Sequence, residues 1–134
     1  MIYLDTSVAL AALFSEARQP PAELWSLPLI SSRLIEYEMT QRILARKTGQ
    51  GGLGKDGLEA VGVLLGKIQM VEMTPNVLAR AREPFPVEVK TLDALHLATA
   101  AFLVARGQSI SIATYDKRMV AAAKAMKLPV FELP

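Results

Sequence analysis

Short apolar segments typical of buried β-strands alternate along this chain with longer segments of helical periodicity, and this alternation constrains the fold more than any other feature. The β-type segments are residues 2–4, 29–31, 69–72 and 110–113, with 130–131 as a possible fifth. The helical segments are residues 8–14, 22–26, 33–47, 55–66, 77–82, 92–105 and 118–125. Strands that alternate with helices predict a parallel sheet covered by helices on both faces.

The length of the chain fits one domain, because 134 residues without a repeat, a low-complexity segment or a linker can bury a single core. We therefore expect one domain over residues 1–134. Hydrophobic residues make up 51% of the chain and charged residues 21%, which is typical of a globular protein. The net charge of +2 is too small to identify a nucleic-acid-binding protein, since basic surfaces are recognised by clustering.

The chain contains no cysteine, which excludes disulfides, cysteine nucleophiles and cysteine-based zinc sites. Its apolar N-terminus carries Asp5 and lacks the basic start of a signal peptide. The longest apolar stretch, around residues 97–105, is well short of the ~20 residues of a membrane helix. These features predict a cytoplasmic protein that does not contact a membrane.

A glycine-rich stretch over residues 49–57 fits the first seven positions of a phosphate-binding P-loop, from Gly49 to Lys55. The eighth position holds Asp56 where Ser or Thr must bind magnesium, and the stretch follows a helical segment rather than a strand. We interpret it as a turn between two helices.

Two aspartates directly follow β-type segments, which is where ligands bind in open parallel sheets. Asp5 follows residues 2–4, and Asp116 follows the segment that begins at Ile110. Each also precedes a helical segment, where Asp is a favourable N-cap because its side chain accepts hydrogen bonds from free amides. Taken singly, each aspartate is better explained as a cap.

Two further acidic residues lie within helical segments. Asp93 lies in the first turn of a helix that we expect Thr91 to cap, where the helix dipole favours a carboxylate without any functional demand. Glu38 lies on the apolar side of segment 33–47, where a carboxylate is costly unless it is paired or coordinated. A salt bridge to Arg42, one turn along the helix, is the structural alternative.

Clustered carboxylates repel one another, so a protein gathers them mainly to hold a hard divalent cation such as Mg²⁺ or Mn²⁺. Such a cation activates water for in-line attack on a phosphodiester and stabilises the charge that develops on the phosphate oxygens. We therefore expect Asp5, Glu38, Asp93 and Asp116 to meet in one pocket and to support phosphodiester hydrolysis.

Four motifs occur in order from near Met1 almost to Pro134. They are Leu4-Asp5-Thr6-Ser7, Ser32-Arg33-Leu34 followed by Glu38, Leu92-Asp93-Ala94-Leu95-His96-Leu97-Ala98-Thr99-Ala100, and Ala113-Thr114-Tyr115-Asp116-Lys117-Arg118. Together they resemble the PIN-domain ribonucleases, and most closely the VapC-type toxins. The resemblance implies a three-layer α/β PIN-like fold with a parallel sheet of order 3-2-1-4-5 and helices on both faces. It also implies a metal-dependent endoribonuclease that is the toxin of a VapBC-type toxin–antitoxin system.

The resemblance assigns roles to the four acidic residues. It implies that Asp5 and Asp93 are the principal metal ligands, with Mg²⁺ or Mn²⁺ as the cofactor. It implies that Asp116 is either a third acidic ligand or a ligand of a second metal ion, and that Glu38 orients the metal-bound water.

Other polar residues lie in or near the same motifs. Thr6 and Thr114 match positions that could hydrogen-bond the acidic cluster. His96, the only histidine, matches a packing or supporting position, and hard cations rarely need an imidazole ligand. Basic residues near Glu38 and Asp116 could contact RNA phosphates or form an ordinary solvated face; they are Arg42, Arg46, Lys47, Lys117 and Arg118.

The resemblance also implies partners: an RNA substrate, a VapB-type antitoxin and a second copy of the chain in a homodimer. The apolar segment 8–14, with Trp25 nearby, could offer a surface that an antitoxin covers. An antitoxin arginine could then enter the acidic pocket, because a guanidinium matches carboxylate geometry.

Two other functions compete with this interpretation. A non-catalytic PIN-like module would bind metal, RNA or a protein without cleaving anything, although the four intact carboxylates argue against it. A phosphorelay receiver would need paired acidic residues after the first strand, where Asp5 stands alone. Incubation of RNA with the protein, with and without manganese and chelator, distinguishes the three.

Overall fold

Four short strands rich in Ile, Leu and Val form the central parallel sheet in the computed structural model, which describes residues 1–46 and 54–134. The strands are β1 (Ile2–Leu4), β2 (Leu29–Ser32), β3 (Ile68–Val71) and β4 (Ser111–Ala113). They pair in the order β3-β2-β1-β4, and all of these pairings are parallel. The expected order 3-2-1-4-5 therefore agrees with the structure over its first four positions.

The expected fifth strand is reduced to a single bridge between Ile112 and Val130. The Ile112 amide donates to the Pro129 carbonyl at 2.9 Å, and the Phe131 amide donates to the Ile112 carbonyl at 2.8 Å. Pro129 has no amide hydrogen to donate, and a proline restricts the residue before it, so regular pairing does not extend here.

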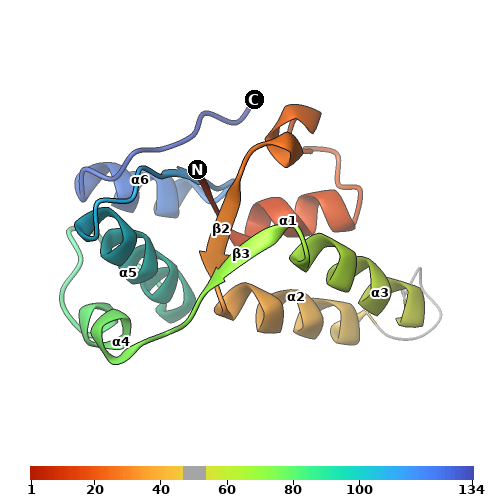
Figure 1. The fold of residues 1–134 in the computed structure, drawn as a ribbon, viewed down its shortest axis with the longest axis horizontal. Helices are drawn as coiled ribbons and strands as arrows, with labels where there is room; N and C mark the ends of the chain where they lie inside the picture. The colour runs from red at the N-terminus through yellow and green to blue at the C-terminus, as the bar shows by residue number, and fades with distance from the viewer. Residues whose placement is uncertain (47–53) are drawn as a thin grey trace.

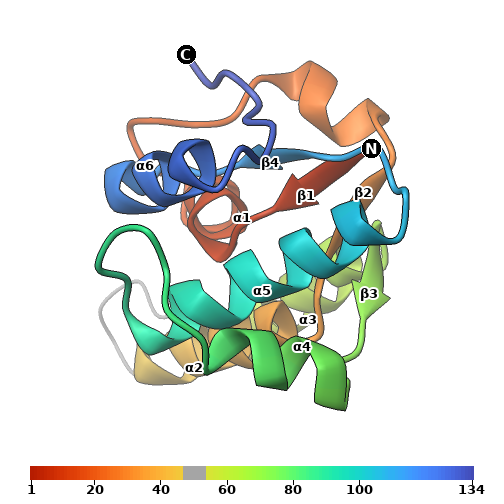
Figure 2. The ribbon, with the colours of Figure 1, turned by 90° about the vertical axis from the view of Figure 1, so that its left-hand side faces the viewer.

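Helices cover both faces of the sheet, as the alternation of elements predicts (Figure 1). One layer contains α1 (Thr6–Leu13), α2 (Leu34–Ala45) and α3 (Gly54–Leu65). The other contains α5 (Thr91–Ala105) and α6 (Lys117–Ala125), with α4 (Pro75–Ala81) packed against α5 (Figure 2). No helix in the described parts of the chain is long and apolar enough to cross a bilayer.

Alternation along β1 divides the core between these two layers. Ile2 and Leu4 belong to the cluster formed with α1, α2 and α3, whereas Tyr3 belongs to the cluster formed with α5 and α6. Successive side chains of a strand point to opposite faces of the sheet. Tyr3 therefore points toward α5, where it is completely buried.

Several helix boundaries differ from the sequence-based expectation. Helix α1 begins at Thr6 rather than Val8, because the Asp5 side chain accepts a hydrogen bond from the Ser7 amide and caps it there. The expectation that Thr91 caps α5 is wrong. Lys90 occupies the N-cap, with an extended backbone and a carbonyl that accepts from the Ala94 amide at 2.8 Å.

Two other expectations concern segments between the main elements. Residues 22–26 form a 3₁₀ helix, η1 (Ala22–Ser26). The turn expected over residues 49–57, including most of the rejected P-loop match, falls largely on residues 47–53, which lie outside the described residues. The described part of this stretch, from Gly54 onward, belongs to α3.

Helix α1 offers less free surface than its sequence indicates. Val8, Ala9, Leu10 and Ala11 are buried in the core, and Leu13 and Phe14 pack partly against it. Trp25 is also partly buried against the same cluster. The apolar character of this helix is thus explained mainly by the sheet that it covers.

Candidate active site

The candidate site lies where the carboxyl ends of β1 and β4 meet. Asp5 immediately follows β1, and Asp116 follows β4 by way of Thr114 and Tyr115. The chain connects β1 to β2 on one side, while β4 lies on the other side, so this is the switch point of the sheet. Elements α2 and α5 contribute Glu38 and Asp93 from the two opposite helical layers.

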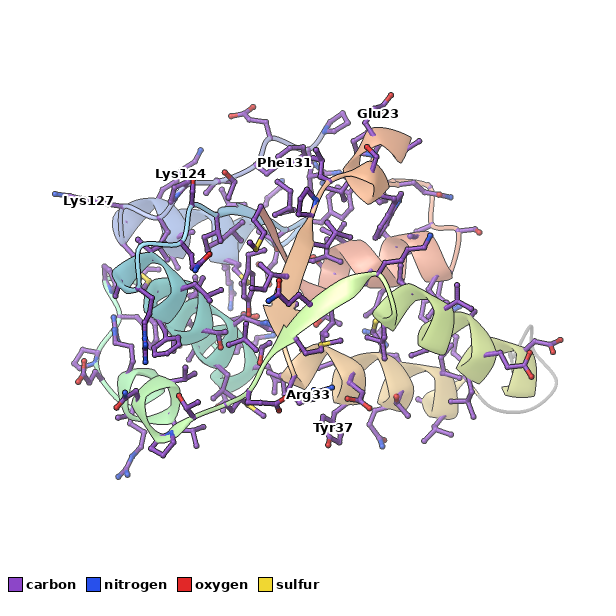
Figure 3. The ribbon with its side chains drawn as sticks, in the orientation of Figure 1. Glu23, Arg33, Tyr37, Lys124, Lys127 and Phe131 are labelled. Atoms are coloured by element: carbon purple, nitrogen blue, oxygen red, sulfur yellow. The ribbon has the colours of Figure 1, made fainter. Side chains whose placement is uncertain are left out.

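The end of β2 is held beside the end of β3 at the same edge of the sheet. The Arg33 amide donates to the Val71 carbonyl at 2.8 Å, and the Arg33 guanidinium pairs with Glu72 at 2.7 Å and Glu36 at 3.0 Å. Figure 3 shows Arg33 at the end of β2, where α2 begins. These contacts fix the start of the helix that carries Glu38.

Asp5 is buried and tied to both neighbouring segments. Its Oδ2 atom accepts from the Ser7 hydroxyl at 2.6 Å, from the Ser7 amide at 3.3 Å and from the Thr114 hydroxyl at 2.8 Å. Every hydrogen bond that the described residues donate to the Asp5 carboxylate ends on Oδ2. The other oxygen, Oδ1, therefore remains available to a ligand.

Asp116 caps α6, as the structural alternative for this residue predicts. Its Oδ1 atom accepts from the amides of Arg118 at 2.9 Å and Met119 at 3.3 Å. The Asp116 amide in turn donates to the Thr114 hydroxyl oxygen at 3.0 Å. Thr114 thus links Asp116 to Asp5, and capping leaves one Asp116 oxygen for another partner.

Glu38 is held by α1 and α5 rather than by its own helix. The Thr6 hydroxyl donates to Glu38 Oε1 at 2.6 Å, and His96 Nε2 lies 2.6 Å from the same oxygen. Among the ion pairs of the described residues, Glu38 pairs with His96 and not with Arg42. The sequence therefore placed Glu38 correctly on a core-facing stripe, but the salt bridge considered as its structural alternative does not form.

Asp93 is electrostatically coupled to all three other carboxylates. Burial raises its pKa most, and the charges of Asp116, Asp5 and Glu38 raise it further, while His96 acts in the opposite direction. The charges of the other three carboxylates therefore act on Asp93 in the first turn of α5. Hydrogen bonds join Asp5 to Asp116 through Thr114, whereas none joins the Asp93 side chain to the other three among the described residues.

His96 uses both ring nitrogens within the protein. Its Nδ1 atom lies 2.8 Å from the Tyr3 hydroxyl, and its Nε2 atom bonds Glu38. Burial lowers the pKa of His96, but the hydrogen bond with Glu38 and the nearby charge of Asp5 raise it more, so the net shift is upward. Both ring nitrogens of His96 therefore already have hydrogen-bond partners within the protein.

Tyr3 and Ser7 are site residues to which the sequence analysis assigned no role. Ser7 was visible within a motif, and its hydroxyl both donates to Asp5 and accepts from the Tyr115 amide at 3.0 Å. The sequence does indicate that the Tyr3 hydroxyl has a hydrogen-bond partner, because a tyrosine inside a buried strand needs one. Which partner it finds depends on packing across the sheet.

The oxygen-rich donor set fits a hard divalent cation better than a soft one. The carboxylates are nevertheless spaced more widely than a coordination shell. Within residues 1–46 and 54–134, no three Asp, Glu or His side chains converge closely enough to hold a metal ion. A cation at this site would have to draw the side chains together against the repulsion that helps raise the pKa of Asp93.

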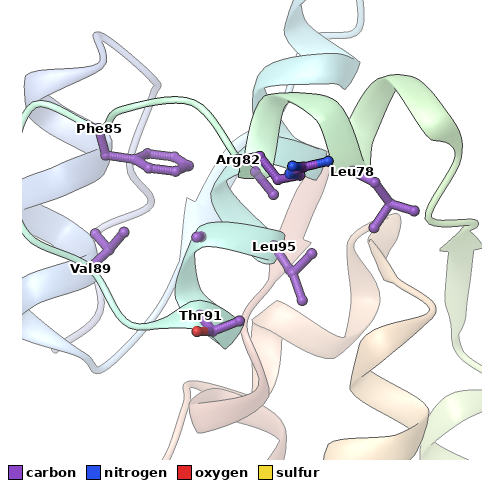
Figure 4. A pocket seen from close by; sticks show the side chains of 8 residues that line it. Leu78, Arg82, Phe85, Val89, Thr91 and Leu95 are labelled. Carbon is purple, nitrogen blue, oxygen red and sulfur yellow. The ribbon is translucent and has the colours of Figure 1, made fainter.

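A pocket of about 220 Å³ adjoins Glu38. It is lined by Thr6, Leu10, Glu38, Gln41, Arg42 and Leu92. A larger pocket of about 580 Å³ lies between α4, the segment around Phe85 and the start of α5 (Figure 4). Its lining, which includes Leu78, Phe85 and Val89, contains none of the four carboxylates. Glu38 is the one of the four that lines the smaller pocket, so neither pocket holds all four together as the sequence predicts.

Comparisons with known proteins relate this chain to one family. The PIN domain family model matches residues 2–125. Ribonuclease VapC35 of Mycobacterium tuberculosis is 30% identical over 135 residues, which cover 97% of this chain and 95% of that protein. Ribonuclease VapC46 of the same organism is 31% identical over 133 residues, covering 96% of this chain and 95% of that protein.

Similarity of fold extends to solved structures. It is a crystal structure of VapBC2 from Rickettsia felis bound to a DNA fragment from their promoter, with a TM-score of 0.69 over 100% of both chains. The sequences are 12% identical, so this likeness concerns the fold alone.

Proposed function

This chain belongs to the VapC-type branch of the PIN-domain family, and we propose on that premise that it is an endoribonuclease acting as the toxin of a VapBC-type toxin–antitoxin system. The observation that carries the proposal is the position of Asp5 and Asp116 at the adjoining carboxyl ends of β1 and β4, where the Thr114 hydroxyl hydrogen-bonds both residues. Similarity to two ribonucleases over nearly their full length supports it.

We propose that Asp5, Asp93 and Asp116 hold Mg²⁺ or Mn²⁺. The oxygen donors support this choice, and a divalent charge would offset the repulsion among the carboxylates. When bound, such a cation supplies Lewis-acid stabilisation of the charge that develops on the phosphate. Asp5 is prepared for this role because Ser7 and Thr114 hold its Oδ2 and leave Oδ1 available.

Two side chains of the pocket are assigned the proton transfer and the contact with the RNA backbone. Glu38 is partly exposed, and its carboxylate is suited to accept a proton from the attacking water. Arg42 lines the pocket beside it and is suited to contact a phosphate of the RNA backbone. Hydrolysis would then form a bond from the water oxygen to phosphorus and break the bond from phosphorus to one ribose oxygen. The water proton would pass to Glu38, and the departing ribose oxygen would take a proton from solvent.

We further propose a VapB-type antitoxin as partner, a homodimeric toxin and action in the cytoplasm, where RNA is found. The similar structure from Rickettsia felis is that of VapBC2, which supports the antitoxin. Size-exclusion chromatography with light scattering tests the dimer, which should have twice the 14.6 kDa mass of one chain.

The decisive experiment is incubation of the purified protein with a structured RNA in Mn²⁺, in Mg²⁺ and in chelator. We expect internal cleavage with a divalent cation and none with chelator. The matched control is Glu38→Gln, which keeps the side-chain shape but removes the proton acceptor. RNA that is bound but left intact by the wild type in every buffer would favour the alternative of a non-catalytic binding module.

A further inference from the structure

A chain of hydrogen bonds runs from the centre of the sheet to the candidate site. It begins at the buried Tyr3 hydroxyl, which lies 2.8 Å from His96 Nδ1. It continues from His96 Nε2 to Glu38 Oε1 at 2.6 Å, and the Thr6 hydroxyl meets the same Oε1 at 2.6 Å. The His96 side chain is 1% exposed, so water does not compete for these bonds.

The direction of each hydrogen bond follows from the chemistry of the groups. An ionised carboxylate only accepts, so Nε2 must carry a hydrogen and donate it to Glu38 Oε1. In the neutral ring Nδ1 then accepts from the Tyr3 hydroxyl, which keeps its proton at neutral pH because a tyrosine pKa is about 10. In the imidazolium form Nδ1 donates to the tyrosine oxygen instead, and the bond to Glu38 is unchanged.

These bonds make the two oxygens of Glu38 unequal. Both hydrogen bonds that the described residues donate to Glu38 end on Oε1. Oε2 therefore keeps its full capacity to accept a proton, while rotation of the carboxylate is restricted by two short bonds. His96 is itself fixed, because the Tyr3 ring meets it edge to face, with 5.9 Å between the ring centroids.

We infer that His96 is a positioning residue for Glu38. Supported by the Tyr3 hydroxyl, His96 holds Glu38 Oε1 by a hydrogen bond, an arrangement that we call the Tyr3–His96–Glu38 lock. Oε2 is then the oxygen that takes the proton from the attacking water. The inference rests on the proposed ribonuclease function and assigns a role within it. Displacing a reacting group by about 1 Å can reduce a rate about 100-fold, so a histidine that never touches RNA can still control turnover.

Two amide variants separate positioning from packing. In His96→Gln the longer side chain brings an amide N–H near the place of Nε2, so it can still donate to Glu38. In His96→Asn the shorter side chain reaches only toward Tyr3. We expect kcat to fall about 100-fold in His96→Asn and less than about 10-fold in His96→Gln, with KM for RNA unchanged in both.

Both variants lose the packing of the imidazole ring. If His96 had only a structural role, both substitutions would lower the fraction of folded protein, and the kcat of the folded protein would be similar in the two variants. Assays are therefore run well below both melting temperatures and are normalised to folded protein. A second comparison uses the Glu38→Gln background, where His96→Asn should cause no further loss because His96 acts through Glu38. Equal kcat losses in the two single variants, or fully additive losses in the double variant, would overturn the inference.

A readout that does not depend on activity comes from the imidazole nitrogens. The chain has one histidine, so the long-range ¹H–¹⁵N spectrum of tag-free protein contains one ring system. We expect Nε2 to be protonated in wild type and the Nε2 signal to change in Glu38→Gln. A ring protonated only at Nδ1, or averaged between tautomers, would contradict the Tyr3–His96–Glu38 lock whether or not RNA is cleaved.

The proposed function and the lock can fail separately. If the wild type does not cleave RNA although Nε2 is protonated as expected, the ribonuclease proposal is refuted, and the catalytic role of His96 fails with it. The hydrogen bonds from Tyr3 to His96 and from His96 to Glu38 would still stand.

Discussion

Asp5 performs two tasks with its two oxygens. Oδ2 caps α1 and binds the Ser7 and Thr114 hydroxyls, while Oδ1 remains available. Asp116 is divided in the same way, since Oδ1 caps α6. A cap and a site ligand are therefore not competing explanations for these residues, because a carboxylate can satisfy helix amides with one oxygen and offer the other.

This division predicts the outcome of Asp5→Asn. The amide oxygen can still accept from Ser7 and Thr114, and Asn is as good an N-cap as Asp, so the fold should survive. The charge needed by a divalent cation is lost, and we expect RNA cleavage to fall at least about 100-fold. Gel assays with circular dichroism measure both effects. The control is Glu23→Gln, which removes an exposed charge from η1 and should cleave normally. Normal cleavage by Asp5→Asn would remove Asp5 from the proposed ligand set.

Asp93 predicts a pH-dependent change in stability. Burial and the charges of Asp116, Asp5 and Glu38 raise its pKa in the folded state. The ionised side chain therefore destabilises the fold fully above the folded-state pKa. This penalty decreases as the pH falls through the folded-state pKa and is gone below the unfolded value of about 3.9. Asp93→Asn should raise the melting temperature of the metal-free protein at pH 7, and the gain should disappear near pH 3.5. Thermal unfolding at both pH values measures this, and a gain that is independent of pH would contradict the electrostatic origin.

At the scale of elements, α5 joins the core to the site. Its first turn carries Asp93, and His96 follows three residues later on the same face of the helix, because residues three apart are neighbours on a helix surface. Leu97, one turn after Asp93, is completely buried in the hydrophobic cluster that contains Tyr3. The packing of this helix therefore sets the position of both site residues.

Two leucines of α5 test that packing. Leu97→Ala should lower the free energy of unfolding by about 2–5 kcal/mol, because it opens a cavity in the core. The control is Leu92→Ala on the same helix, where the side chain is 47% exposed, and its effect should stay within about 0.5 kcal/mol. Urea denaturation measures both variants. If the two substitutions cost the same, α5 is not anchored through Leu97.

Local sequence patterns predicted only some of these features. Residues that follow strands, such as Asp5 and Asp116, were found because strand periodicity is local and the site of open sheets lies beyond the strand ends. Glu38 stood out because it interrupts an apolar stripe. The contact between Tyr3 and His96 spans 93 positions, and no periodicity within either segment can specify which side chains meet across a sheet. The fifth strand was overestimated because Pro129 limits its pairing.

At the scale of the whole molecule, the sequence pattern predicts the type of sheet but not the order of its strands. Alternation of strands and helices predicts a parallel sheet, but any of several orders would satisfy it, and the expected order came from the family resemblance. The observed order β3-β2-β1-β4 places β1 at the centre, between the two segments that lead to Glu38 and Asp116. The approach of carboxylates from distant parts of the chain is therefore a property of the topology, and binding of the proposed cation there would depend on global stability.

That dependence predicts how manganese changes thermal stability. A ligand that binds only the folded state stabilises it by RT ln(1 + [L]/Kd), which is about 1.4 kcal/mol at a tenfold excess over Kd. For a chain of this size the melting temperature of the wild type should rise by about 5 °C. The rise should be much smaller in Asp5→Asn, which lacks one proposed ligand. It should equal the wild-type rise in the control Glu23→Gln, which loses the same charge at an exposed position outside the site. Differential scanning calorimetry in Mn²⁺ and in chelator measures the three proteins. Equal shifts in wild type and Asp5→Asn would mean that manganese binds elsewhere on the folded chain, and the assignment of the cation to the acidic site would then fail.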